Sequence, residues 1–397
     1  MTSRYSCKTI IQWFCIVTIS LFVVGCSSEP QTGQAGGPAP AVVEVWHSLQ
    51  GAEAEALQVQ AQLIAEDHPE VIPKLSYVPE QKFVPFSYQA EAGGEGPELF
   101  IASREIIRQL YEQGALAPAA YEDQEGFPAA LQGFVHHGDK FGLPWLTDVS
   151  LLYFRTDSAV IPINLADLFS AQDGVVINAA DAVTLSAWWN GQGGRLMSEG
   201  IPVLDDPSNV AFLEQLLAWQ SVDALRIDPD ALTTFSSGQT PYMIAGASAA
   251  KTLTETNVPW GSILLSDLLN GQGQPLLGTT LGIANSAIKS NKTMISAIQI
   301  VEKALLTPDV EGAMMEAGGR LPANKGYYQR QEAQKGVFLQ AKLALDRAWA
   351  LEGSAPEWTL IPLQESAWSN ALAGSVAPID ALVNAQEQAR TILTPMD

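Results

Sequence analysis

Residues 42–69, VVEVWHSLQGAEAEALQVQAQLIAEDHP, contain the change of pattern that decides the fold. Residues 42–46 form a short apolar run rich in valine, which is typical of a buried strand. Residues 52–67 carry apolar side chains at helical spacing, and Pro69 stops the pattern. The stretch therefore predicts a strand, a loop and a helix in succession.

The same alternation continues to Gly114. We expect further strands at 75–78 and 98–102, followed by helices at 82–92 and 105–113. The glycine ends the last of these helices. Strands that alternate with helices predict a parallel α/β sheet.

A second α/β region is expected after Pro144, and the last quarter of the chain reads as mostly helical. The expected strands are 149–154, 175–177 and 242–244, and the expected helices are 209–221, 294–306, 308–317 and 337–352. The predicted fold class is α/β, with two lobes and helical extensions.

Composition excludes several classes of protein. The chain has 397 residues, of which 47% are hydrophobic, so it is expected to be globular rather than disordered. Its 21 Lys and Arg against 43 Asp and Glu give a formal charge of −22. That field repels phosphate backbones, so no nucleic-acid partner is expected.

Residues 1–25 are predicted to be an export signal. They hold Arg4 and Lys8, no acid, and an apolar run that is short for a membrane span. Val23-Val24-Gly25-Cys26 resembles the bacterial lipobox, which implies that Cys26 receives a diacylglycerol and becomes the new N-terminus. The alternative is an ordinary membrane anchor with an incidental cysteine.

The remainder of the N-terminal region, residues 26–41, is rich in Gly, Pro, Ser and Gln, and we expect a flexible tether. Cys7 and Cys15 would leave with the signal, so the folded part is expected to hold no free thiol. Lipidation places the protein at the outer face of the cell membrane or in the periplasm.

Five segments carry a resemblance to a known family. They are 45–53 (VWHSLQGAE), 96–102 (GPELFIA), 141–157 (FGLPWLTDVSLLYFRTD), 235–246 (FSSGQTPYMIAG) and 317–324 (AGGRLPAN). In this order they resemble the extracellular solute-binding proteins of ABC importers, in the carbohydrate-binding group related to maltose-binding protein. The resemblance runs over nearly the whole chain after the tether.

The resemblance implies a type II periplasmic-binding-protein fold with discontinuous lobes and a hinged cleft. The first lobe would comprise 42–147 with 279–324, and the second 148–278 with 325–397. Such a protein captures a carbohydrate by closing its lobes and delivers it to membrane permease subunits. It is expected to be a monomer, not an enzyme, and to need no cofactor or metal.

A sugar has apolar faces edged by hydroxyls, so its site needs aromatic plates and hydrogen-bonding groups. The resemblance places ligand contacts after the first and third strands, at the crossing between lobes and near later helix starts. The positions that it implies are Trp46, His47, Ser48, Arg104, Glu105, Trp145, Asp148, Asp181, Trp188, Trp189, Ser248 and Trp368. Neighbouring helical residues point about 100° apart, so we expect at least one of Trp188 and Trp189 to face the cleft or solvent.

Other ligands remain open at this point. Gly246-Ala247-Ser248 lacks the aromatic residue of the family pattern, and Val183 stands where maltose-binding members carry an aromatic. A polyol phosphate, such as glycerol phosphate, is therefore an alternative ligand. A sensory receptor subunit is an alternative role.

Three other motifs suggest chemistry that we rank lower. Ser248-Ala249-Ala250-Lys251 and Ser286-Ala287-Ile288-Lys289 both fit the S-x-x-K of serine acyl enzymes, and two matches in one chain show how common the pattern is. His136-His137 with Asp139 suggests a metal site, but reads better as a solvated loop. Tyr327-Tyr328 resembles the tyrosine pair of ferric-ion-binding relatives, without a clear companion ligand.

Overall fold

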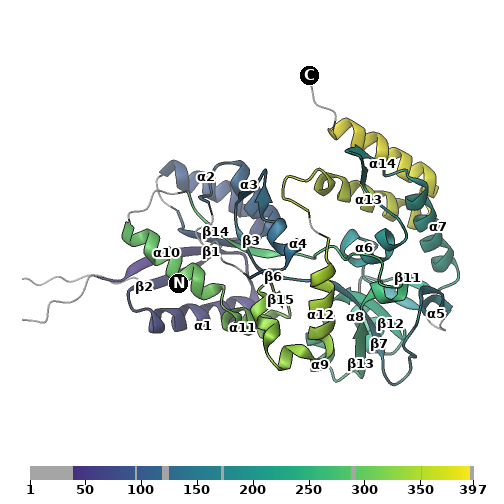
Figure 1. Cartoon of the computed structure of the whole chain (residues 1–397), viewed down its shortest axis with the longest axis horizontal. Helices are drawn as coiled ribbons and strands as arrows, with labels where there is room; N and C mark the ends of the chain where they lie inside the picture. Colours follow the sequence, from purple (N-terminus) through teal and green to yellow (C-terminus); the bar gives the residue numbers. More distant parts are fainter. Residues whose placement is uncertain are drawn as a thin grey trace, which may run out of the picture. The chain divides into compact units, whose positions relative to one another are not determined.

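The computed structural model describes residues 39–93, 96–118, 125–170, 174–287, 292–349 and 351–393. The predicted export signal, Cys26 and most of the predicted tether lie outside these residues. From Pro40 onward the chain forms one unit that contains two large sheets, each with its own helices (Figure 1). We call the six-stranded sheet with its helices the first lobe and the five-stranded sheet with its helices the second lobe.

The first lobe is built on a mixed sheet in the order β15-β6-β14-β3-β1-β2. Its strands are β1 (Ala41–His47), β2 (Val71–Tyr77), β3 (Leu99–Ser103), β6 (Leu143–Thr147), β14 (Leu281–Asn285) and β15 (Leu321–Pro322). β1 pairs parallel with both β2 and β3, as predicted. The sheet is not purely parallel, however, because β14 returns from the second lobe and pairs antiparallel with β3 and β6.

Alternate residues of the parallel strands enter two cores. Val43 and Val45 face a core shared with Leu57 of α1, whereas Phe100 faces a core shared with Phe83 of α2. This period of two is what a sheet covered on both faces requires. The helices and short 3₁₀ turns of this part are α1 (Gly51–Asp67), η1 (Glu80–Lys82), α2 (Phe83–Gly93), α3 (Arg104–Glu112), α4 (Pro128–Gln132), α10 (Lys292–Leu305) and α11 (Pro308–Gly318). The small hairpin of β4 (Val135–His136) and β5 (Asp139–Lys140) follows α4.

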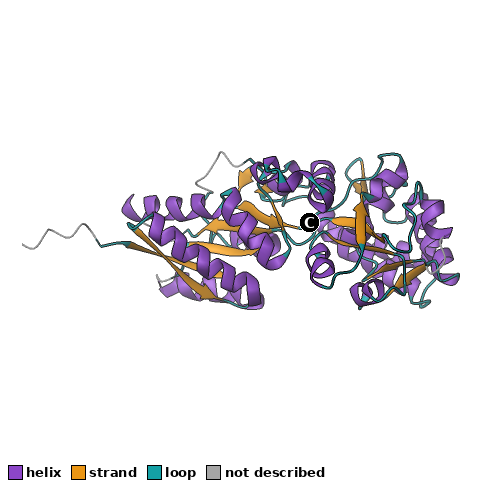
Figure 2. Cartoon of the chain, turned by 90° about the horizontal axis from the view of Figure 1, so that it is seen from below, coloured by secondary structure: helices purple, strands orange, loops and turns teal. Residues whose placement is uncertain are grey.

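The second lobe has the strand order β11-β8-β12-β7-β13. Its strands are β7 (Ser150–Arg155), β8 (Val175–Ile177), β11 (Leu225–Ile227), β12 (Tyr242–Gly246) and β13 (Trp260–Ile263), with a hairpin of β9 (Met197–Ser198) and β10 (Ile201–Pro202). Figure 2 shows helices on both sides of its strands. One face packs on α6 (Ala182–Gly191), α7 (Pro207–Ser221), α13 (Glu357–Leu372) and α14 (Pro378–Leu393), and the other on α8 (Ala231–Ser236), α9 (Ala249–Glu255) and α12 (Gly336–Arg347).

The helices of this part include two near the C-terminus that the sequence reading did not identify, α13 and α14. The elements are α5 (Leu165–Ser170), α6 (Ala182–Gly191), α7 (Pro207–Ser221), α8 (Ala231–Ser236), α9 (Ala249–Glu255), η2 (Leu265–Leu269), η3 (Lys325–Gln329), η4 (Glu332–Gln334), α12 (Gly336–Arg347), α13 (Glu357–Leu372) and α14 (Pro378–Leu393). The helix predicted at 337–352 therefore begins one residue late and ends five residues beyond Arg347, the last residue of α12.

The chain changes sheets between β6 and β7 and returns between β13 and β14. These two crossing segments lie together, because the Gly278 backbone N–H donates to the Asp148 carbonyl at 2.8 Å. The residue at which each lobe begins stays a prediction.

Candidate functional site

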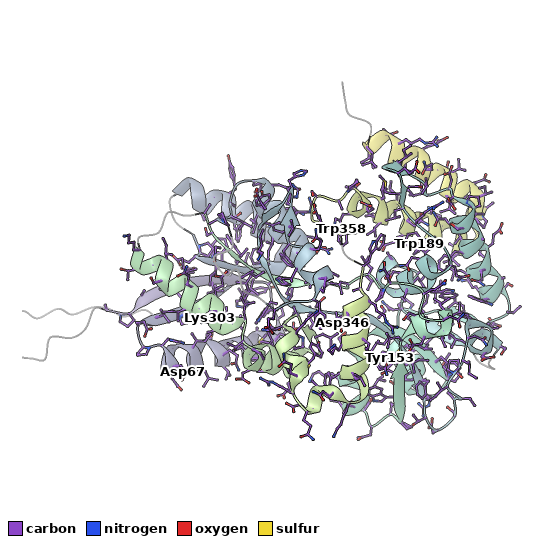
Figure 3. All side chains as sticks on the ribbon, in the orientation of Figure 1. Asp67, Tyr153, Trp189, Lys303, Asp346 and Trp358 are labelled. Carbon is purple, nitrogen blue, oxygen red and sulfur yellow. The ribbon has the colours of Figure 1, made fainter. Side chains whose placement is uncertain are left out.

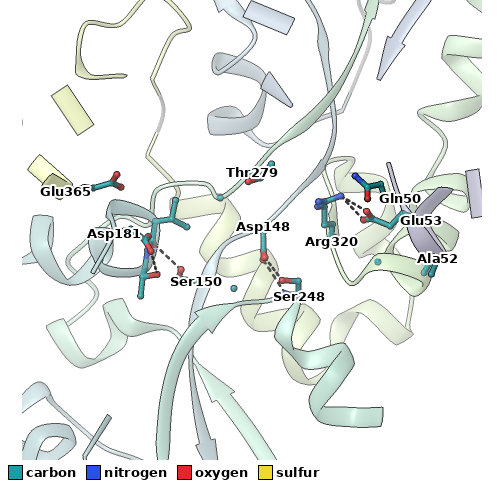
Figure 4. Close-up of a pocket in the computed structure, with 16 residues that line it drawn as sticks. Gln50, Ala52, Glu53, Asp148, Ser150, Asp181, Ser248, Thr279, Arg320 and Glu365 are labelled. Atoms are coloured by element: carbon teal, nitrogen blue, oxygen red, sulfur yellow. Dashed lines mark hydrogen bonds and ion pairs between the residues drawn. The ribbon is translucent and has the colours of Figure 1, made fainter. Parts of the chain in front are cut away.

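The main cavity has a volume of about 760 Å³ and is lined from both lobes (Figure 4). The first lobe contributes Gln50, Ala52, Glu53, Ala317, Gly318 and Arg320. The second contributes Ser150, Asp181, Val183, Thr184, Gly246, Ser248 and Glu365, and the crossing segments contribute Asp148, Gly278 and Thr279. Most of these side chains carry hydrogen-bonding groups, and none of the residues that line this cavity is aromatic.

The first-lobe wall carries one ion pair. Glu53 lies in the first turn of α1, and Arg320 precedes β15. Arg320 Nη1 donates to both carboxylate oxygens of Glu53 at 2.7 Å. Gly318 makes room for this carboxylate, because a Cβ there would lie 2.1 Å from Glu53 Oε1. The positive charge of this wall is thus already paired.

Asp148 lies where the chain crosses from the first lobe to the second. Its Oδ1 accepts from the Val149 N–H at 2.8 Å and the Ser248 N–H at 3.3 Å, and its Oδ2 accepts from Ser248 Oγ at 2.6 Å. Burial raises the pKa of Asp148, and these hydrogen bonds oppose the rise. Gly246 is required here, because a Cβ would lie 2.3 Å from Asp148 Oδ2.

The second-lobe wall presents two carboxylates at the start of α6. Asp181 caps this helix and accepts from the Thr184 N–H at 2.8 Å and from Thr184 Oγ1 at 3.1 Å. Glu365 of α13 accepts from the Ala182 N–H at 2.8 Å, and burial raises its pKa. The free N–H groups of a helix start stabilise such carboxylates.

A smaller cavity of about 290 Å³ adjoins the main one and shares Val183, Gly278, Thr279 and Glu365 with it. Arg104, Glu105 and Trp358 also line it. The guanidinium carbon of Arg104 lies 3.6 Å from the centroid of the Trp358 ring. This indole is the aromatic plate nearest to the polar cavity among the residues that line these two pockets.

The structure brings together five of the predicted contact residues. Asp148, Asp181 and Ser248 line the main cavity, and Arg104 and Glu105 line the adjoining one.

Three other predicted residues, at the end of β1, line neither cavity. Trp46 is half-buried and packs edge-on to Phe100 at 6.1 Å. His47 is 5% exposed, and its burial lowers its pKa. The Ser48 N–H donates to the Ile101 carbonyl at 3.2 Å. Gln50, in the loop that follows them, and Glu53, in the first turn of α1, line the main cavity instead.

Four predicted tryptophans lie in hydrophobic cores and not in the cleft, so their assignment as ligand contacts is wrong. They are Trp145, Trp188, Trp189 and Trp368, each at most 1% exposed. Trp145 packs in the first lobe and donates to the Leu305 carbonyl at 2.8 Å. The other three share one core in the second lobe, where a ligand has no access.

The expectation that Trp188 or Trp189 faces the cleft or solvent also fails. Trp188 stacks on Phe169 at 4.8 Å, whereas Trp189 meets Trp368 at 5.7 Å and donates to Asn209 Oδ1 at 2.8 Å. These partners come from several other helices, so α6 is covered on more than one side. Figure 3 shows Trp189 within the second lobe. Two divergent side chains can therefore both be buried.

The sequence reading missed several lining residues, among them Gln50, Glu53, Trp358 and Glu365. The first two lie in a segment that carries the family resemblance, so a signal was present. Trp358 and Glu365 lie in α13, which belongs to none of the five segments.

The alternative chemistries gain no support from the geometry. Lys251 Nζ pairs with Glu255 Oε1 at 2.8 Å and donates to the Glu316 carbonyl, while Ser248 Oγ donates to Asp148. The serine therefore lacks the lysine base that an acyl enzyme needs. Across the residues that the structure describes, no group of three His, Cys, Asp or Glu is arranged to hold a metal ion.

Comparison with known sequences identifies the family. A family model described as bacterial extracellular solute-binding protein matches residues 86–341. The chain belongs to this family. It is a solute-binding component of an ABC importer and not an enzyme, as the sequence motifs predicted. No curated protein sequence matches the chain.

Solved structures agree on the fold. The GacH receptor of Streptomyces glaucescens is 19% identical, with a TM-score of 0.74 over 89% of this chain and 98% of that one. A cyclo/maltodextrin-binding protein in complex with maltotetraose is 16% identical, with a TM-score of 0.76 over 92% and 100%. The maltose/maltodextrin-binding domain MalE of Bdellovibrio bacteriovorus is 16% identical, with a TM-score of 0.70 over 89% and 100%. The predicted type II periplasmic-binding-protein fold is confirmed.

In the part of the chain that the structure describes, no helix has the length and apolarity to cross a bilayer.

Proposed function

We propose that this solute-binding protein captures a neutral oligosaccharide in the main cavity, between its two lobes, and delivers it to a membrane permease. The observation that carries the proposal is the lining of this cavity. Both lobes contribute hydrogen-bonding side chains to it, so a ligand that fills it contacts both at once. Such a ligand favours the closed arrangement of the lobes by its differential contacts.

The chemistry of the lining suits sugar hydroxyls. Carboxylates accept hydrogen bonds from hydroxyls, while the hydroxyls and amide of Ser150, Thr279 and Gln50 both donate and accept. The carboxylates of Asp148, Asp181 and Glu365 are already oriented by backbone N–H groups. Preorganised acceptors of this kind lower the entropy lost on binding.

A polyol phosphate is disfavoured by charge. The main cavity is lined by four carboxylates, on Glu53, Asp148, Asp181 and Glu365, and by one guanidinium, that of Arg320. The guanidinium is paired with Glu53. A phosphate would therefore meet uncompensated negative charge, whereas a neutral sugar would not.

Structurally similar proteins whose ligands are known support a neutral oligosaccharide as the ligand class. The GacH receptor was solved with acarbose, and the other two structures hold maltotetraose and maltotriose. Trp358 lines the adjoining cavity, where Arg104 covers one face of its ring, so a sugar in this cavity contacts the rest of the indole. Gly246-Ala247-Ser248 and Val183 lack the aromatic residues of the family pattern, so the test below compares several sugars.

The proposal includes lipid anchoring at Cys26. The lipobox-like Val23-Val24-Gly25-Cys26 precedes a Gly- and Pro-rich segment that ends just before β1. Fifteen residues of such a tether span about 20 Å, which keeps the folded part near the membrane and its permease. Acyl chains contribute about 0.8 kcal/mol per buried CH₂, enough for stable anchoring when two or more are present.

Native mass spectrometry tests the ligand class. The protein is mixed with equal concentrations of maltose, maltotriose, maltotetraose, other neutral oligosaccharides and glycerol 3-phosphate. The proposal predicts a complex whose added mass equals one intact neutral sugar. Retention of the phosphate alone, or the appearance of cleaved sugar, would contradict it.

A further inference from the structure

The adjoining cavity differs from the main one in the chemistry of its wall. In the main cavity, Val183 is the only lining residue larger than alanine whose side chain is apolar. The adjoining cavity, of about 290 Å³, is lined by six residues with apolar side chains, which are Val183, Leu276, Leu277, Trp358, Ile361 and Pro362. We call these six residues the apolar wall. The lining thus changes from polar to apolar between two cavities that adjoin.

The apolar wall is built from three segments that are hydrogen-bonded to one another. They are α6, α13 and residues 276–277, which precede the return to the first lobe. The Leu276 N–H donates to Ser186 Oγ of α6 at 2.7 Å. Glu365 Oε1 of α13 accepts from the Ala182 N–H at the start of α6 at 2.8 Å. The apolar wall is therefore complete without any residue of the first lobe.

The cationic groups that line the adjoining cavity already have partners. Arg104 lies over the Trp358 ring and pairs with Glu105. Arg108 pairs with Glu112, four residues later on α3. Neither guanidinium is left to attract an anionic ligand, so the apolar side chains give this cavity its preference.

A fully hydroxylated sugar ring is matched less well by the apolar wall than by the lining of the main cavity. Hydroxyls that face Leu277 or Ile361 lose hydrogen bonds to water and gain none in return. An apolar group loses no hydrogen bonds there and gains free energy as its surface leaves water. Since an apolar cavity of about 150 Å³ can hold benzene, a phenyl-sized group fits within about 290 Å³.

The junction of the two cavities fixes where the polarity of the ligand should change. Val183, Gly278, Thr279 and Glu365 line both cavities. Figure 4 shows Glu365 at the end of the main cavity away from Glu53. A ligand that fills both cavities is hydroxylated from Glu53 to Glu365 and apolar beyond Glu365.

We infer that the ligand is a glycoside, a neutral sugar in the main cavity that carries an apolar group of about phenyl size in the adjoining one. The inference rests on the proposed function for its sugar half. Its apolar half rests on the six residues of the apolar wall. These residues then select among sugars by what is attached to them.

Isothermal titration calorimetry on the full chain compares methyl α-maltoside with two maltosides that carry an aromatic group. Phenyl α-maltoside carries it at the reducing end. The methyl maltoside with a benzylidene acetal on its non-reducing ring carries it at the other end, so both orientations of the sugar are covered. At least one of the two should bind about tenfold more tightly than methyl α-maltoside, as burial of an apolar group of this size implies.

Ile361→Thr and Ile379→Thr form a matched pair of variants. Ile361 is 9% exposed and belongs to the apolar wall, whereas Ile379 is 46% exposed on α14 and lines neither cavity. I361T places a hydroxyl in the apolar wall, so most of the tenfold gain should be lost, while I379T should keep it. Circular dichroism checks that each variant is folded. Pro362→Ser, at an exposed position of the same wall, repeats the test if I361T is not folded.

Fluorobenzene, followed by fluorine NMR, tests the apolar wall without a sugar. It should bind to the parent and to I379T, and its binding should weaken in I361T. This measurement does not depend on which sugar the main cavity takes.

The outcomes separate this inference from sugar capture itself. If methyl α-maltoside binds and neither aromatic group adds affinity, or if I361T keeps the whole gain, the glycoside is overturned and sugar capture stands. If no maltoside binds, maltose is not the sugar, and fluorobenzene decides. Binding that weakens in I361T alone then supports the apolar half of the ligand, whereas no binding, or binding that I361T retains in full, overturns it.

Discussion

Arg320 donates from Nη1 to both oxygens of Glu53, each at 2.7 Å, within the first-lobe wall of the main cavity. The two residues are 267 positions apart in the sequence and meet because α1 and the turn before β15 lie side by side. Arg320 carries the one guanidinium that lines this cavity, and the ion pair with Glu53 neutralises its charge. It leaves the cavity acidic, which underlies the preference for an uncharged ligand.

Glu53→Gln should weaken that preference. The substitution keeps the side-chain size and removes the charge that pairs with Arg320, so the guanidinium becomes available to a phosphate. We expect binding of glycerol 3-phosphate to become detectable, or to strengthen about tenfold, while the neutral sugar binds less tightly. Isothermal titration calorimetry measures both. Unchanged phosphate binding would argue against charge as the basis of selectivity.

Asp148→Asn should lower sugar affinity. The carboxylate accepts from Ser248 Oγ and two backbone N–H groups, and an amide cannot replace all of these acceptors. The expected loss is about 1–2 kcal/mol, the scale of one hydrogen bond to a charged group. Ser248→Ala, which removes only the 2.6 Å bond, is the companion variant and should cost less. An equal affinity in parent and D148N would remove Asp148 from the site.

Glu302 should make stability depend on pH. It is 1% exposed, and burial raises its pKa from 4.5 to about 7, while the Asn285 side chain opposes the rise. The folded state therefore binds more protons than the unfolded state between these two values. Stability should fall by about 3 kcal/mol as pH rises through this window and then level off. Urea denaturation of the parent and Glu302→Gln measures the effect, and the variant should lack this part of the slope.

Trp189→Ala should lower stability more than sugar affinity, and Trp358→Ala should do the reverse. Trp189 is 1% exposed in the second-lobe core, so its truncation should cost about 3–5 kcal/mol of stability and leave sugar affinity of the folded fraction intact. Trp358 lines a cavity, so its truncation should change affinity more than stability. Denaturant titration and calorimetry on both variants separate the two effects. A loss of affinity confined to W189A would reverse the assignment.

Cys26→Ser should release the protein from the membrane. If Cys26 carries the lipid, the parent is extracted only by detergent, and its mass includes a diacylglycerol on a chain that begins at Cys26. The serine variant should appear in the soluble fraction. Cys7→Ser, within the predicted export signal, should behave like the parent. Detergent-dependent extraction of the Cys26 variant would contradict lipidation there.

The strands near the start of the fold could be predicted because their patterns are local. β1, α1 and β3 lie within two residues of the predicted ranges, since valine runs and helical spacing are properties of a few neighbouring residues. β2 begins at Val71 rather than 75, because it is an edge strand and tolerates Pro73. The return of β14 as an antiparallel neighbour of β3 depends on chain topology, which no local pattern contains.

The site was harder to predict than the fold. Asp148 was found because it lies in a segment that carries the family resemblance, and Ser248 because it follows another such segment, 235–246, by two residues. Trp188 and Trp189 were misplaced because burial depends on how many other helices surround α6, and one sequence window does not contain that information. Trp358 was missed because its role comes from a partner, Arg104, 254 residues earlier in the chain.

Sugar capture in the main cavity is tested by calorimetric titration of neutral maltooligosaccharides, from maltose to maltotetraose, and of other neutral oligosaccharides into the parent and into an Asp148→Ala, Glu365→Ala double variant. We predict saturable, one-to-one binding of at least one neutral sugar by the parent, and a loss of at least tenfold in affinity in the folded double variant. Absence of binding by every neutral sugar, or equal affinity in parent and variant, would contradict it.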